Sequence, residues 1–207
     1  MADDNDVDVK IIYDEADFGV GDAVLVVDVN DDGFDDLLIG GVGTKDDSQE
    51  VVIYVVKGGS TMPTSVDLDG KGYDFIIRGA ERASNGTTAN DMGIGFFKGD
   101  FDGDGKVDWA VTVDSGRGAE DTMERAWETY VFLGESRVFN KSIKGVDLPE
   151  DADFVIFGPE VASDANGVAI VAGDINNDGR DDLVFGVAQS AATSTGDVRI
   201  IFGQRNF

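Results

Sequence analysis

The sequence predicts an all-β fold made of three similar units, and three features support this. An aspartate-rich nonapeptide occurs three times, at 28–36, 100–108 and 174–182, with starts 72 and 74 residues apart. Each copy has a short apolar run on either side, and a third apolar run follows in every unit. Apolar runs of about five residues separated by a glycine-containing turn are typical of strands joined in a hairpin. We therefore expect antiparallel sheets of repeated design.

The expected strands follow one order in every unit. The first strands are 23–27, 93–99 and 167–173. The second strands, after the nonapeptides, are 37–42, 109–113 and 183–187. The third strands are 50–58, 126–134 and 197–203. Fourth strands follow in the first two units, at 73–79 and 152–158.

The third unit has no fourth strand of its own, and the segment 7–13, VDVKIIY, is left over before the first unit. Like 73–79 and 152–158, it carries an aspartate near its start and then branched apolar residues. We therefore expect it to complete the last unit. Three four-stranded antiparallel units closed in this way are the blades of a β-propeller. The alternative is a β-sandwich of twelve strands.

This interpretation makes residues 1–207 a single propeller domain. Its predicted parts are the closing segment 7–19, blade 1 at 20–80, blade 2 at 90–160 and blade 3 at 166–207. Because rings of three blades are unusual, we expect a homodimer with six blades, in preference to a closed three-bladed monomer or a fragment of a longer propeller.

Composition excludes several classes of function. The chain has 42 acidic and 16 basic residues and a formal charge of −26, whereas nucleic acid and anionic membranes require a basic surface. No stretch approaches the length of a membrane span. With no cysteine and no histidine, the chain has no disulfide and no thiolate or imidazole metal ligand. Oxygen ligands for a hard cation remain.

The nonapeptides have the spacing of such ligands. Numbered from the first aspartate, positions 1, 3, 5 and 9 carry carboxylate or amide oxygens, and position 6 is always glycine. The glycine allows a sharp turn that brings alternate side chains together, and position 7 adds a backbone carbonyl. One Ca²⁺ site is therefore predicted in each repeat, and the alternative is a solvated turn. The predicted ligands are Asp28, Asn30, Asp32, Phe34 and Asp36 in repeat 1; Asp100, Asp102, Asp104, Lys106 and Asp108 in repeat 2; and Asp174, Asn176, Asp178, Arg180 and Asp182 in repeat 3.

These loops differ from EF-hands, which place a glutamate at position 12. Position 12 here is Ile39, Val111 or Phe185, within an apolar strand, so position 9 supplies the last ligand. Repeat 1 reads Asp17-Phe18-Gly19, an apolar strand, D-x-N-x-D-G-x-D-D-L and then I-G-G. This pattern resembles the FG-GAP repeat of the integrin α-subunit propeller and its bacterial relatives. Repeats 2 and 3 depart from it, with Met92-Gly93 and Asn166-Gly167 in place of Phe-Gly.

The resemblance implies four-stranded blades, calcium in the first hairpin, and a binding or adhesion role. We predict no catalytic residues, because the tightest carboxylate clusters are already assigned to metal. We expect a protein or glycan ligand, and an extracellular location where millimolar calcium fills weak sites. The alternatives are a lectin-like module, a calcium-dependent carbohydrate-active enzyme and a purely structural scaffold.

Ligand binding is expected at the end of the blades away from the calcium hairpins. The loops predicted there are 41–49, 78–91, 114–125, 158–167 and 188–196. Arg117, Arg125 and Trp127 lie near the longest of them and suit an acidic or sugar ligand; the alternative, which we favour, is a solvating arginine pair beside a strand-start tryptophan. Trp109 is predicted to be core because it aligns with Leu37 and Leu183.

Overall fold

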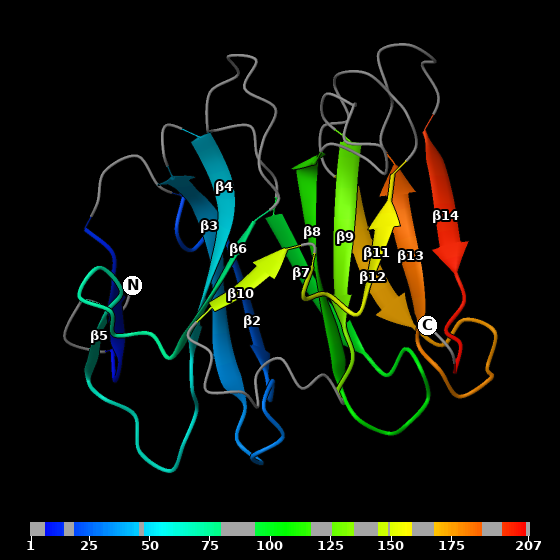
Figure 1. The fold of residues 1–207 in the computed structure, drawn as a ribbon. Helices are drawn as coiled ribbons and strands as arrows, with labels where there is room; N and C mark the ends of the chain where they lie inside the picture. The colour runs from blue at the N-terminus through cyan, green and yellow to red at the C-terminus, as the bar shows by residue number, and fades with distance from the viewer. Residues whose placement is uncertain are drawn as a thin grey trace.

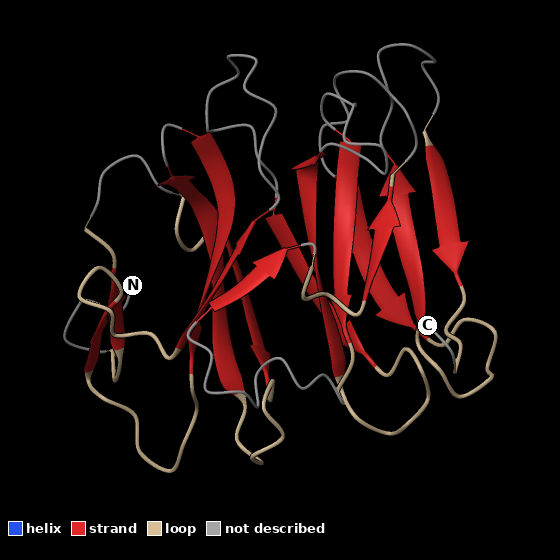
Figure 2. Cartoon of the chain, viewed as in Figure 1, coloured by secondary structure: helices blue, strands red, loops and turns tan. Residues whose placement is uncertain are grey.

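The computed structural model describes residues 7–14, 19–45, 48–79, 94–116, 126–134, 145–148, 150–158, 168–187 and 196–205. The regular structure of these residues is entirely β, in four sheets, three of which stand side by side (Figures 1 and 2). The prediction of an all-β fold is confirmed. The described residues do not show a closed ring.

Blade 1 has the predicted antiparallel order. Its strands are β2 (Ala23–Val27), β3 (Asp36–Lys45), β4 (Ser48–Val56) and β6 (Phe75–Gly79). A fifth strand that the sequence pattern did not predict, β10 (Gly145–Leu148), pairs in parallel with β6. It comes from the connection between the third and fourth strands of blade 2, so it ties the two blades together.

Blades 2 and 3 repeat this order. Blade 2 consists of β7 (Ile94–Gly99), β8 (Asp108–Gly116), β9 (Ala126–Phe132) and β11 (Phe154–Phe157). Blade 3 consists of β12 (Val168–Gly173), β13 (Asp182–Val187) and β14 (Asp197–Ile201). The first strands of neighbouring blades contact each other, β2 with β7 and β7 with β12.

The alternation of side chains along each second strand decides how the blades stack. Leu38 of blade 1 lies in one core cluster with Trp109 of blade 2, and Ala110 of blade 2 lies in another with Leu183 of blade 3. Each blade therefore has a preceding face, which contains Leu37, Trp109 or Leu183, and a following face, which contains Leu38, Ala110 or Val184. The following face of one blade packs on the preceding face of the next.

The prediction that segment 7–13 completes blade 3 is wrong. Within it, β1 (Lys10–Ile12) pairs in parallel with β5 (Ser65–Asp67), a second strand that the pattern did not predict. The physical reason is burial, because Ile11 and Tyr13 join Val66 and Leu68 over the preceding face of blade 1, on which none of the described blades packs. The two short strands act as a cap for that face.

Candidate metal centre

The three nonapeptides form the hairpins β2–β3, β7–β8 and β12–β13, as predicted. They lie at one end of the molecule, the lower end in Figure 1. Neighbouring hairpins also touch, since the Lys106 ammonium lies 3.3 Å from the Asp31 carboxylate and thereby joins repeats 1 and 2. The candidate centres are thus three adjacent loops on one surface.

The aspartate at position 1 organises each turn. In every repeat its carboxylate accepts hydrogen bonds from the backbone N–H groups of positions 5 and 6. The distances are 3.2 and 2.8 Å for Asp28, 3.1 and 3.0 Å for Asp100, and 3.0 and 2.9 Å for Asp174. The glycine at position 6 has a φ of 86–88° in all three repeats, in the left-handed region that side chains disfavour. Position 6 is therefore glycine because of the turn itself.

The aspartate at position 9 is fully buried in all three repeats and joins two parts of its blade. One oxygen accepts the backbone N–H of position 2, and the other accepts that of a glycine just after the third strand. The second contacts are Gly58 to Asp36 at 2.9 Å, Gly134 to Asp108 at 2.6 Å and Gly203 to Asp182 at 3.0 Å. We call this pair of contacts the position-9 staple. It holds the hairpin against the end of the third strand.

Repeat 2 brings three carboxylates together. Oxygens of Asp100, Asp102 and Asp108 lie within 4.8 Å of one another. Burial, chiefly, and repulsion from Asp102 raise the pKa of Asp108 to about 6, although its backbone hydrogen bonds act in the opposite direction. Burial likewise raises the pKa of Asp36 in repeat 1. A divalent cation would relieve this crowding, so the donor set of repeat 2 suits a hard cation such as Ca²⁺.

The other predicted side chains are arranged less uniformly. Asp104 is exposed, and its carboxylate accepts the Lys106 N–H at 2.7 Å. In repeat 1, Asp32 accepts the Phe34 N–H at 3.0 Å, and the Asn30 amide donates to Asp36 at 2.9 Å. The predicted carbonyl ligands at position 7 stay predictions.

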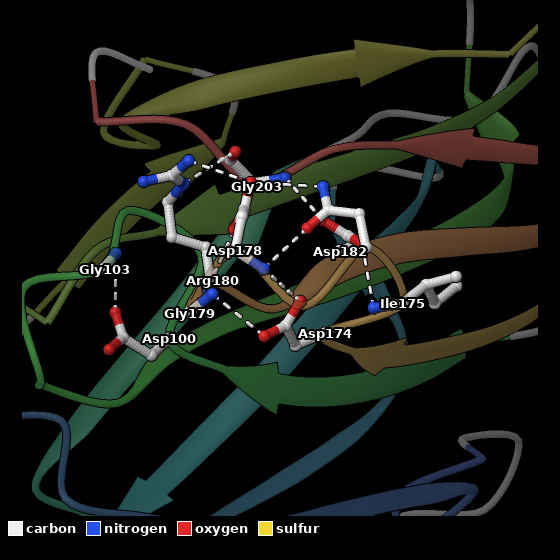
Figure 3. A network of polar contacts seen from close by, with 10 residues as sticks. Asp100, Gly103, Asp174, Ile175, Asp178, Gly179, Arg180, Asp182 and Gly203 are labelled. Carbon is white, nitrogen blue, oxygen red and sulfur yellow. Dashed lines mark hydrogen bonds and ion pairs between the residues drawn. The ribbon is translucent and has the colours of Figure 1, made fainter.

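Repeat 3 contains a cation of its own. The Arg180 guanidinium pairs with Asp178 at 2.8 Å and also donates to the carbonyl of Gly203 at 2.9 Å (Figure 3). The Asn176 amide donates to Asp178 as well, at 3.1 Å. Because Asp178 already has these partners, repeat 3 would bind a metal ion less readily than repeat 2.

Repeats 2 and 3 also hold each other directly. The Asp181 N–H donates to the Asp100 carbonyl at 2.8 Å, and the Asp181 carboxylate accepts the Asp100 N–H at 2.9 Å. Phe101, which follows Asp100 in the chain, is fully buried between blades 2 and 3, together with Phe185. Position 1 of repeat 2 is therefore held in place by repeat 3.

Sequence reasoning missed the position-9 staple, the inter-repeat role of Asp181 and the burial of Phe101. For the staple, the available signal was the glycine that closes every third strand. The prediction that Trp109 is core is confirmed, since it is buried and stacks on Phe132. Trp127, which was not predicted to be core, is also buried and stacks on Phe185. Arg117, Arg125 and most of the predicted ligand-binding loops (80–91, 117–125, 159–167 and 188–195) lie outside the described residues.

Among the described residues, no helix is long and apolar enough to cross a membrane.

Comparison with known proteins adds one match. No curated protein matches the chain. A family model described as "FG-GAP repeat" matches residues 166–201, which contain the three strands and the hairpin of blade 3. This match confirms the resemblance to the FG-GAP family that the nonapeptides indicated.

Proposed function

We propose that this chain is a calcium-stabilised, integrin-like interaction module. Its hairpins bind Ca²⁺, and the opposite end of its blades binds a protein or glycan ligand outside the cell. The observation that carries the metal part of the proposal is the convergence of Asp100, Asp102 and Asp108 in repeat 2. The FG-GAP match supports an interaction module over an enzyme, because repeats of this family generally serve in binding.

Calcium would supply positive charge where the carboxylates converge. The side chains at positions 1, 3 and 9 would hold it, and position 5 and the carbonyl of position 7 complete the proposed set. Each bound ion would offset repulsion within a hairpin that the backbone already shapes. Repeat 2, with three converging carboxylates, should bind most tightly, and repeat 3 most weakly because Arg180 already neutralises Asp178.

The six-bladed homodimer stays a proposal. Its formation would require the β1–β5 cap to be displaced from the preceding face of blade 1. Such a ring would bring the following face of blade 3 onto the preceding face of blade 1 in the other copy. Ile11, Tyr13, Val66 and Leu68 cover part of that preceding face. The β1–β5 cap would have to move before the dimer could form.

Thermal unfolding in calcium and in chelator, combined with calorimetric titration, tests the metal part. Ca²⁺ at 100 times its dissociation constant stabilises the folded state by about 2.7 kcal/mol per site, which is about 5–10 °C for a domain of this size. Asp102→Ala, which removes the ligand oxygen at position 3, should remove most of the contribution of repeat 2. Asp35→Ala is the matched control, because it removes one carboxylate from an exposed, non-ligand position of repeat 1.

Superimposable unfolding curves in calcium and chelator would overturn the metal sites. The ligand part needs a separate measurement, namely binding to a glycan array in calcium and in chelator. Glycan binding that disappears in chelator supports a glycan ligand, and its absence directs the search to proteins.

A further inference from the structure

The fourth strands of blades 1 and 2 are placed by the same pair of backbone contacts. In blade 1, the Asp74 N–H donates to the Val55 carbonyl at 2.9 Å, and the Asp74 carboxylate accepts the Lys57 N–H at 2.9 Å. In blade 2, the Asp153 N–H donates to the Val131 carbonyl at 3.0 Å, and its carboxylate accepts the Leu133 N–H at 2.8 Å. An aspartate thus fixes where the fourth strand begins.

The residues after this aspartate are also alike. They are Phe75-Ile76-Ile77 in blade 1 and Phe154-Val155-Ile156 in blade 2. The phenylalanine pairs with Val55 or Val131 of the third strand and packs in the core between blades. The fourth strand is therefore recognised as Asp-Phe-(Ile or Val)-Ile, antiparallel to the third strand.

Blade 3 presents the same third-strand edge. Ile200 pairs with Val184 as Val55 pairs with Leu38, so the Ile200 carbonyl and the Phe202 N–H correspond to the two groups that bind the aspartate in the other blades. Gly203 is stapled to Asp182 like its counterparts, which shows that the end of the strand has the same local arrangement. Among the described residues, no strand pairs with the outer edge of β14.

Two side chains of β14 are exposed where their counterparts in blade 1 are buried in the core shared with blade 2. Val198 is 68% exposed and Ile200 is 44% exposed, whereas Ile53 and Val55 of blade 1 are fully buried. Phe202 is 54% exposed. An exposed apolar strand with an open edge readily pairs with another strand. A phenylalanine opposite Ile200 would cover part of this surface.

We propose that the outer edge of β14 binds an extended segment of a partner polypeptide with the pattern Asp-Phe-(Ile or Val)-Ile. The sequence has four Asp-Phe pairs, and only those at Asp74 and Asp153 continue with two branched residues. Both of these segments already serve as β6 and β11, and β1 covers blade 1. A second copy of these 207 residues therefore brings no free segment of this pattern.

Fluorescence anisotropy with labelled peptides tests this edge. The probes are residues 73–79, YDFIIRG, and residues 152–158, ADFVIFG, each with a control in which alanine replaces the aspartate. Both probes should bind saturably, and the alanine controls should bind at least tenfold more weakly. The expected binding does not depend on calcium, so measurements in calcium and in chelator separate this inference from the proposed metal sites.

Two protein variants locate the binding site. Phe202→Pro removes the N–H that the aspartate of the peptide would accept, and Ile200→Lys places a charge opposite the phenylalanine. Each should abolish peptide binding while circular dichroism shows that the blades remain folded.

A third measurement does not depend on either variant. Residues 152–158 attached after Phe207 through a flexible linker of about 18 residues should raise the unfolding temperature more than the same fusion with Asp153 replaced by alanine. The proposal is overturned if the probes fail to bind, if the alanine controls bind equally well, if folded Phe202→Pro and Ile200→Lys proteins still bind, or if the two fusions unfold together. A dimer that buries β14 and excludes the probes would overturn it too.

Discussion

Alanine substitution at position 2 of each hairpin tests the stacking of the blades. This position carries Val29, Phe101 and Ile175 in the three repeats. Val29 is 8% exposed and Phe101 is fully buried, each in the core between its own blade and the next. Ile175, with no described blade beyond it, is 57% exposed. The same position thus has three different environments that are set by the neighbouring blade alone.

The expected costs follow from these environments. Phe101→Ala removes a whole ring from a packed interface and should lower the free energy of unfolding by about 3–5 kcal/mol. Val29→Ala removes two methyl-sized carbons at about 0.8 kcal/mol each and leaves a small cavity, for a total of about 1.5–3 kcal/mol. Ile175→Ala loses little buried surface and should cost about 0.5 kcal/mol or less.

Urea unfolding followed by circular dichroism and tryptophan fluorescence measures all three costs. The experiment should be run in excess calcium and at two protein concentrations. If Ile175→Ala costs as much as Val29→Ala at both protein concentrations, the following face of blade 3 is covered within the monomer and the stacking order deduced above is refuted. A cost that grows with protein concentration would identify self-association as the cover.

Three further predictions concern single contacts. Asp181→Ala should weaken calcium binding at repeat 2, because the Asp181 carboxylate accepts the Asp100 N–H; calorimetry should show no such loss for Asp35→Ala, the same position in repeat 1. Gly58→Ala should lower the unfolding temperature markedly, since a Cβ there would lie 1.9 Å from the Asp35 carbonyl oxygen. Burial and the neighbouring Glu128 raise the pKa of Tyr130, so the folded state keeps a proton that the unfolded state loses above about pH 10, and the free energy of unfolding should fall as pH rises past that value. Absorbance at alkaline pH should show Tyr130 ionising only as circular dichroism is lost, and Tyr130→Phe should remove that step; ionisation with the fold intact would contradict the prediction.

The hairpins could be predicted from sequence because both sides of each turn carry a local signal. The first strand of blade 1 was expected at 23–27 and is found at Ala23–Val27. The segment 7–13 resembles the fourth strands in sequence but was assigned to the wrong sheet. Its pairing depends on the preceding face of blade 1, which is distant in sequence from it. A three-residue strand such as β1 could pair with more than one strand. The apolar preceding face of blade 1, on which no described blade packs, determines where β1 lies. The two strands that were not predicted, β5 and β10, have only three and four residues and show no usable periodicity.

In the candidate metal centre, too, local features could be predicted and contacts between distant residues could not. The oxygen spacing shared by the three nonapeptides predicted converging ligands in each hairpin, and the convergence of Asp100, Asp102 and Asp108 agrees with that reasoning. The pairing of Arg180 with Asp178 could not be predicted, because position 7 was considered only for its carbonyl. The contact between Asp181 and Asp100 depends on how two blades stack, which no local pattern encodes.

The position-9 staple has a consequence for how such a molecule can grow. Both of its contacts lie within one repeat, as do the contacts of the fourth-strand aspartates Asp74 and Asp153. The joints between repeats use other residues, a Lys106–Asp31 pair at one boundary and Asp181–Asp100 contacts at the next. Duplication of a repeat would therefore copy its internal framework intact and leave only the joint to be fitted anew. The number of blades is therefore determined by the contacts between repeats and not by the internal structure of a blade.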